Sequence, residues 1–268
     1  MTKPQFSTRV VAEQVLSLAN NDELLALTRV FDSEATSAVG AAELTAKISA
    51  AGGHSVSNWL RSQGVPYTEV LHDVAKTLKV AEVEPLDAIT SSGLTIAEME
   101  RRESDPIVSA DVTRSWRPHI SAYVLRHEHS VLRKFMADTY ERMSPTQKAE
   151  VDRKVADIAR ELPGTRAKGL TASAAFLLVA NAGGFATYTL MSSVISTVAV
   201  GGAPFVVYTS AASMLHFLLG PLGWAALGAA AIYKLGGPND QQCVKSVLAV
   251  AMLRSRIEAA VHEVTRKQ

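Results

Sequence analysis

Apolar residues recur every three or four positions through the first 80 residues, in short segments separated by glycines. In residues 41–51, Leu44, Ile48 and Ala51 fall on one helical face, and the segment stops at the glycine pair 52–53. A second segment carries Val70, Leu71, Val74 and Leu78 at the same spacing. No stretch alternates with period two, so the pattern predicts an all-α protein that begins with a cluster of short helices.

Two segments also carry helix-start signals. Asn20 or Asn21 is a candidate N-cap, and the acidic pair 22–23 then lies in the first turn, where carboxylates complement the helix dipole. Ser144 precedes Pro145 and stands three positions before Gln147, a pattern that favours a reciprocal cap. We therefore expect helices to begin at about residues 21 and 145.

The pattern changes along the chain and suggests three parts. Residues 1–81 form the predicted N-terminal helical domain, and residues 82–118, richer in Pro, Ser, Asp and Glu, form a predicted linker or insertion with one short helix near 95–103. Residues 119–268 form the predicted C-terminal helical domain, with amphipathic helices at 119–162 and 240–266. We expect these helices to bundle around a hydrophobic helical hairpin.

Residues 169–233 contain no Asp, Glu, Lys or Arg and form the predicted hairpin. Glycines and prolines divide this run into pieces shorter than the roughly 20 apolar residues of a membrane span. If Pro221 only kinks the chain, residues 205–233 form one helix about 44 Å long, enough for a tilted span. Basic residues at both ends, Lys168 and Lys234, favour a hairpin with both ends on one side of a membrane. A helix that is apolar all round is equally typical of the buried centre of a bundle.

Several residues of the run are candidate functional positions. His216 is the only histidine of the run and is either a pH-sensitive element or a neutral core histidine. Trp224 is either a membrane-interface residue or a packing anchor. Glycines and prolines mark the hairpin tip and a candidate hinge: Gly201, Gly202 and Pro204 at the tip, and Gly220, Pro221 and Gly223 at the hinge.

Composition excludes several classes of function. The chain has 47% hydrophobic and 20% charged residues and a net charge of +1, with mixed signs, so no basic surface for nucleic acid is indicated. Cys243 is the only cysteine, which excludes a disulfide within the chain and suits a reducing compartment. The N-terminus lacks the apolar region of a signal peptide, so we expect a cytoplasmic start.

No motif for catalysis or cofactor binding is present. His127 and His129 flank Glu128, but residues two apart on a helix point in opposite directions, so we expect two solvated histidines. A zinc-protease motif would need histidine where Val131 stands, and neither a nucleophile elbow around His54 or His72 nor a nucleotide-binding loop occurs. We therefore expect no enzyme activity, no cofactor, no metal and no small-molecule substrate.

Two groups of motifs resemble those of the bacterial YaaW-like proteins. The first block is carried by Gly52, Gly53, Trp59, Arg61, Gly64, Pro66, Tyr67 and Asp73, within roughly residues 40–80. The second is carried by Ala182-Gly183-Gly184-Phe185, Gly220-Pro221-Leu222-Gly223-Trp224, Gly237-Pro238 and Ala251-x-Leu253-Arg254, within roughly residues 145–256. Residues 82–143 have no counterpart. The resemblance implies the same helical organisation, and part of that family is labelled as similar to a chaperone for ubiquinol-cytochrome c reductase assembly.

Two functions follow as expectations. The first is a non-enzymatic protein that associates with or inserts into the inner membrane from the cytoplasm, as a perforating effector in stress or defence, with lipid or a protein as partner and with self-association. The second is an interaction or chaperone-like module in which the hydrophobic run is permanent core. Burial of residues 169–233 by other helices distinguishes the two.

Overall fold

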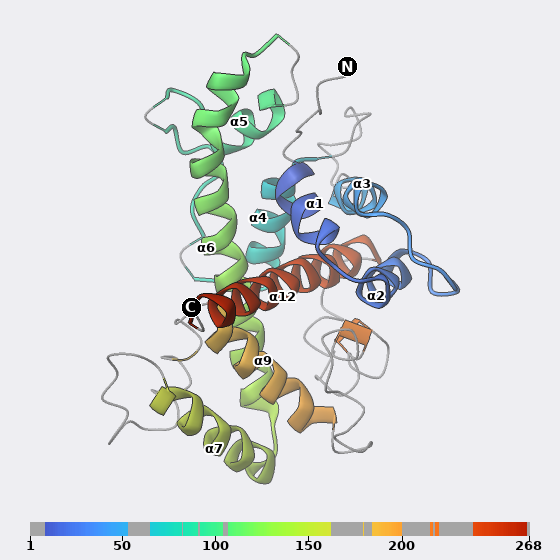
Figure 1. Cartoon of the computed structure of the whole chain (residues 1–268), viewed down its shortest axis with the longest axis vertical. Coiled ribbons are helices and arrows are strands. Elements are labelled where there is room, and N and C mark those ends of the chain that lie inside the picture. The colour runs from blue at the N-terminus through green and yellow to red at the C-terminus, as the bar shows by residue number, and fades with distance from the viewer. Residues whose placement is uncertain are drawn as a thin grey trace.

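The computed structural model is all-helical, as the sequence pattern predicts (Figure 1). It describes residues 9–52, 65–81, 83–90, 92–103, 107–161, 179, 184–199, 215–216, 218–219 and 238–266. Its helices are α1 (Arg9–Ser17), α2 (Asn21–Phe31), α3 (Ala41–Gly52), α4 (Tyr67–Thr77), α5 (Ile96–Glu103), α6 (Ala110–Arg142), α7 (Pro145–Glu161), α9 (Gly184–Ala199) and α12 (Pro238–Arg266). Within the described ranges, extended pairing is limited to one antiparallel bridge, Ile89 with Thr95.

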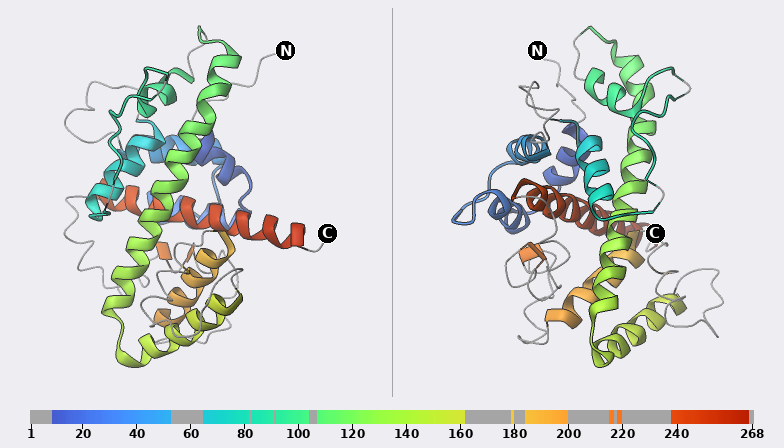
Figure 2. Two further views of the ribbon diagram at one scale, coloured as in Figure 1. Left: turned by 90° about the vertical axis from the view of Figure 1, so that its left-hand side faces the viewer. Right: turned by 180° about the vertical axis from the view of Figure 1, so that it is seen from behind.

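The helix α12 crosses the middle of the molecule (Figures 1 and 2). The helices α1, α3 and α4 lie on one side of it, α7 and α9 lie on the other, and α2 lies beside its N-terminal end. It contacts α9 most extensively, and also α1, α2, α3, α4 and α6. Residues 247–253 of α12 are at most 1% exposed, because a helical stretch that is apolar on all sides is stable only when other helices surround it.

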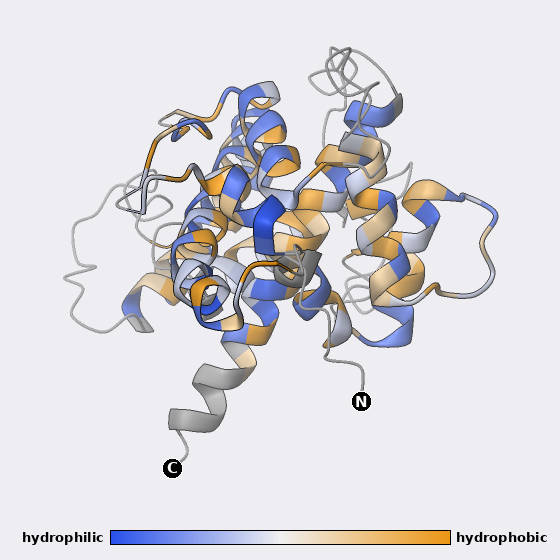
Figure 3. Ribbon diagram, turned by 90° about the horizontal axis from the view of Figure 1, so that it is seen from above, coloured by the Kyte–Doolittle hydropathy of each residue, from blue (hydrophilic) through white to orange (hydrophobic). Residues whose placement is uncertain are grey.

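Several of the surrounding helices, among them α1, α2 and α4, are amphipathic. In Figure 3 most of them carry hydrophilic residues along one side and hydrophobic residues along the other. Leu44, Ile48 and Ala51 of α3 are all buried, as predicted. The predicted caps are also confirmed: Asn20 and Glu23 form a capping box on α2, and the Ser144 hydroxyl accepts from the Gln147 N–H while the Gln147 side chain accepts from the Ser144 N–H.

The long helix α6 differs from the predicted division of the chain. It runs through Pro118, so the predicted boundary between residues 118 and 119 falls inside a helix. An internal proline costs a helix about 3 kcal/mol, because it removes one backbone hydrogen bond and crowds the preceding turn. Trp116 and Ile120, on either side of the proline, are 7% and 1% exposed, and their burial offsets this cost. The predicted linker therefore contains α5 and the beginning of α6.

Most apolar side chains in the described part of the charge-free run are buried, whereas Tyr188 and His216 are only partly buried. Leu190, Met191, Val194 and Ile195 of α9 are at most 1% exposed, and α9 packs against α12, α7 and α6. Three leucines from the second half of the run are also buried: Leu215, Leu218 and Leu219. No helix within the described residues combines the length and the apolar character that a membrane crossing requires.

Candidate functional site: buried charges around α12

A buried ion pair joins α12 to α6. Arg254 donates from Nε to Glu128 Oε2 at 2.6 Å and from Nη2 to Oε1 at 3.3 Å. The Tyr67 hydroxyl, from the first turn of α4, donates to the same Oε1 at 2.9 Å. Glu128 is 1% exposed, so its charge is removed from water and depends on these donors. Three helices that are distant in sequence therefore meet on one carboxylate.

Burial and the charge of Glu128 together set the pKa values of Tyr67 and Arg254. Burial raises the pKa of Tyr67 well above its ordinary value, and the negative charge of Glu128 raises it further. Burial is the largest single effect and lowers the pKa of Arg254, but the charge and the hydrogen bond of Glu128, together with Tyr67 and Glu258, raise the pKa overall. Tyr67 therefore stays a phenol and Arg254 stays charged, which suits hydrogen-bond donors in a structural junction.

A second buried pair joins α12 to α2. Arg256 Nη2 donates to Glu23 Oε2 at 3.2 Å, and the Asn20 N–H donates to the same oxygen at 2.8 Å. Arg256 Nε lies 3.1 Å from Glu23 Oε1 without hydrogen-bond geometry, so this contact is electrostatic only. Glu23 is fully buried. Tyr188 of α9 interacts electrostatically with both charges, so the pair also faces the hydrophobic run.

A third group of polar residues fixes the chain between α4 and α5 to α6. His127 Nε2 accepts the Glu84 N–H at 3.0 Å, while Nδ1 lies 2.8 Å from the Tyr123 carbonyl oxygen. The bonds assign the proton of the ring to Nδ1. His72 Nδ1 lies 3.1 Å from the Tyr123 hydroxyl. Burial lowers the pKa of His72 to about 4 and also lowers that of His127, so both rings are neutral at pH 7.

The sequence prediction for the His127-Glu128-His129 stretch is therefore wrong in part. We expected two solvated histidines, but His127 is 2% exposed and Glu128 is 1% exposed. The cause is tertiary: residues 83–90 cover this face of α6, and α4 and α12 complete the enclosure. Among the described residues, no group of His, Cys, Asp or Glu side chains has the geometry to hold a metal ion.

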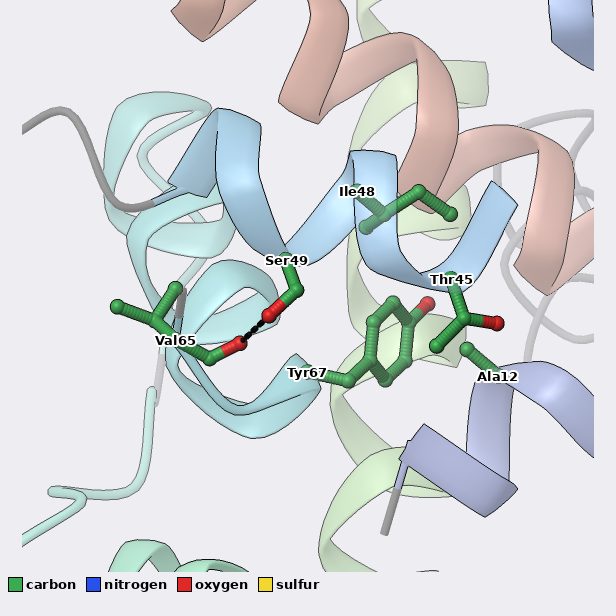
Figure 4. A pocket seen from close by; sticks show the side chains of 6 residues that line it. All are labelled: Ala12, Thr45, Ile48, Ser49, Val65 and Tyr67. Atoms are coloured by element: carbon green, nitrogen blue, oxygen red, sulfur yellow. Dashed lines mark hydrogen bonds between the residues drawn. The ribbon is translucent and has the colours of Figure 1, made fainter. Parts of the chain in front are cut away.

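A small cavity lies where α1, α3 and α4 meet (Figure 4). Its volume is about 10 Å³, on the order of one water molecule, which excludes an organic substrate. The Ser49 hydroxyl donates to the Val65 carbonyl at 2.5 Å, and the Val65 N–H returns a bond to the Ser49 carbonyl at 3.1 Å. The cavity is lined by Ala12, Thr45, Ile48, Ser49, Val65 and Tyr67.

The structure places few of the predicted site residues. Tyr67 lies in the buried cluster, Pro66 precedes α4, Gly52 ends α3 against α4, and Asp73 is exposed on α4. His216 is partly buried and interacts electrostatically with Arg29 and Asp22 of α2. The other predicted positions lie outside the described residues: Gly53, Trp59, Arg61, Gly64, Gly201, Gly202, Pro204, Gly220, Pro221, Gly223, Trp224 and Lys234.

Sequence reasoning missed most of the buried charges. Glu23 was expected only to complement a helix dipole, and neither Glu100 nor Arg256 was singled out. The available signal was weak: Arg254 and Arg256 follow directly on a strongly apolar stretch, where a charge needs a partner. Comparison of the chain with protein-family models, with curated proteins and with solved structures found no match.

Proposed function

We propose that this chain is a non-enzymatic helical protein that stores a hydrophobic hairpin, residues 169–233, against its own helices and associates with a membrane by presenting that hairpin. The observation that carries the proposal is the position of α9. It has no charged residue, and its apolar side chains pack against α12 and α7, whose own sequences carry many charges. Lipid or a second copy of the chain is the expected partner.

The hydroxyl groups of α9 support storage that can be reversed. Ser193 Oγ donates to the Thr189 carbonyl of the same helix at 2.8 Å. Because both groups belong to α9, this bond is kept whether α9 is packed in the protein or inserted in lipid. Thr197 Oγ1 is buried and has no hydrogen-bond partner among the residues that the structure describes, which costs about 1–3 kcal/mol. Because of these hydroxyl groups, burial of α9 stabilises the fold less than burial of a helix whose buried side chains were all Leu or Ile.

A liposome experiment tests the proposal. In a Cys243→Ser background, a fluorophore is attached to Ser193→Cys on α9, or to Ser17→Cys on the exposed end of α1 as the matched control. The labelled chains are mixed with anionic liposomes whose acyl chains carry a quencher, between pH 5 and pH 8. We expect flotation with the liposomes, quenching at position 193 and none at position 17. If, at every pH, the chain does not float with the liposomes and the fluorophore at position 193 is not quenched, the proposal is contradicted.

A second candidate function is an interaction module in which the run is permanent core. It is favoured by the burial of Leu190, Met191, Val194 and Ile195, each at most 1% exposed. This candidate predicts that position 193 stays unquenched with lipid present and that the protein is monodisperse without detergent. Tyr67 and Arg254, which carry the YaaW-like resemblance, meet on Glu128, and this junction fits either function.

A further inference from the structure

The carboxyl group of Glu100 occupies the N-terminus of a helix to which it does not belong. Glu100 lies on α5 and is 1% exposed. Its Oε1 accepts the Tyr67 N–H of α4 at 2.9 Å, and its Oε2 accepts the Thr68 N–H at 3.0 Å. The Thr68 hydroxyl also donates to Oε2. Pro66, the N-cap residue of α4, provides no side-chain cap, so the carboxyl group of α5 supplies one across the junction.

Two physical effects oppose each other at this position. Burial favours the neutral acid, whereas the three donors and the helix dipole favour the carboxylate. Burial is the larger effect and raises the pKa of Glu100 to about 7, against the lowering by the Thr68 and Tyr67 hydrogen bonds. The group therefore changes its charge near neutral pH, far above the range of an exposed glutamate.

We propose that Glu100 is a proton-operated switch at the junction of α4 and α5, which holds the two helices together when protonated and loosens the junction when ionised. The Thr68 hydroxyl suits both states, because it donates to a carboxylate and accepts from a carboxylic acid. Ionisation leaves a buried negative charge whose cost weakens the packing of α5 on α4. This inference does not depend on the proposed membrane function.

The neighbouring groups define the electrostatic background of the switch. They are Tyr67 and Glu69 of α4, Arg101 and Glu103 of α5, Arg117, Tyr123 and Glu128 of α6, and Arg254 of α12. Glu69, Glu103 and Glu128 are paired with Arg101, Arg117 and Arg254, respectively. Burial raises the pKa of both tyrosines, so they remain neutral through pH 8.5. Burial also raises the pKa of Glu103, so the titrating group must be assigned with variants.

Amide NMR of the full chain tests the switch directly. The Tyr67 and Thr68 amide protons bond to the Glu100 carboxyl group, so their chemical shifts report its charge. Between pH 5 and pH 8.5 we expect both to titrate with one midpoint close to 7, and Glu100→Gln to abolish that step. Thr68→Val removes a donor to the carboxylate and should move the midpoint upward by about one unit, whereas Thr68→Ser should not.

Denaturant unfolding gives a second readout. A folded-state pKa above the unfolded value means that the folded chain retains a proton that the unfolded chain has lost, so stability falls as the pH rises from 5 to 8. We expect the unfolding constant of the natural chain to rise over this range about 10- to 100-fold more than that of Glu100→Gln. The matched control is Glu98→Gln on the same helix, since hydrogen bonds to Thr95 lower the pKa of Glu98.

Three results would overturn the switch. They are amide protons that do not titrate between pH 5 and 8.5, a step that survives in Glu100→Gln, and equal pH slopes for the natural chain and Glu100→Gln. If Glu100→Gln does not fold, the two Thr68 variants test the switch instead. An amide midpoint that moves upward in Thr68→Val but not in Thr68→Ser supports it, and equal midpoints in the two variants contradict it. Glu98→Gln should leave the amide midpoint unchanged, and a shift there equal to that in Thr68→Val would also contradict the assignment.

Discussion

Gly52 shows how the role of one residue depends on its neighbours in space. The sequence pattern explains it as a helix stop, and α3 does end there. The structure adds a steric reason, because a Cβ at this position would lie 2.6 Å from Val70 Cγ2 and 2.8 Å from Val65 Cγ2. Both methyl groups belong to short, stiff valine side chains, one just before α4 and one in its first turn, so neither is easily displaced.

Replacing Gly52 with alanine should therefore destabilise the fold. We expect Gly52→Ala to lower the free energy of unfolding by about 1–3 kcal/mol, because α3 and α4 must separate to admit the methyl group. Gly40→Ala is the matched control, since a Cβ there meets nothing within 4 Å, and it should cost less than about 1 kcal/mol, the loss of glycine at the N-cap of α3. Urea denaturation followed by circular dichroism measures both, and equal stabilities for the two variants would contradict the steric explanation.

At the scale of elements, the junction of α6 with α12 depends on one buried pair. The Glu128 side chain is 1% exposed and the Arg254 side chain is 17% exposed. Loss of the partner should therefore destabilise the fold more when Glu128 is the residue left behind. Removing Arg254 leaves a carboxylate with only the Tyr67 hydroxyl as a donor among the three joined residues. Removing the charge of Glu128 leaves a guanidinium that still reaches water.

A double-mutant cycle measures this junction. We expect Arg254→Met to cost about 3–5 kcal/mol of unfolding free energy, Glu128→Gln to cost less, and the double variant to cost at least about 1 kcal/mol less than the sum. The exposed pair Arg114 and Asp111, with side chains 74% and 88% exposed, is the control, and its variants should change stability by less than about 0.5 kcal/mol. Additive costs at Arg254 and Glu128 would show that the pair is not coupled.

At the scale of the whole molecule, α12 lies between α1, α3 and α4 on one side and α7 and α9 on the other (Figure 1). The Arg256–Glu23 pair joins α12 to α2 and interacts with Tyr188 of α9. Loss of the pair leaves Glu23, which is fully buried, without its cation. The packing of α9 should then weaken together with that of α2.

This arrangement predicts that Arg256→Met increases association with liposomes. We expect a several-fold larger floated fraction than for the natural chain, because a stored helix is released more easily when its support is weakened. Gly52→Ala is the control for lost stability, since it loosens α3 and α4 without touching α9. If the two variants float to the same extent at matched stability, the effect is general unfolding rather than release of the hairpin.

The all-helical fold, the helix starts at Asn20 and Ser144, and the buried face of α3 were predictable from the sequence, because they depend on local hydrogen bonds and on apolar spacing along one segment. The continuation of α6 through Pro118 and the pairs Arg254–Glu128 and Arg256–Glu23 were not. Each pair joins residues more than a hundred positions apart, and no local pattern records which charge meets which. The local sequence therefore determined which segments become helices. The tertiary structure decided which polar residues are enclosed between them, because burial and charge pairing depend on neighbours that only the packing of α12 brings together.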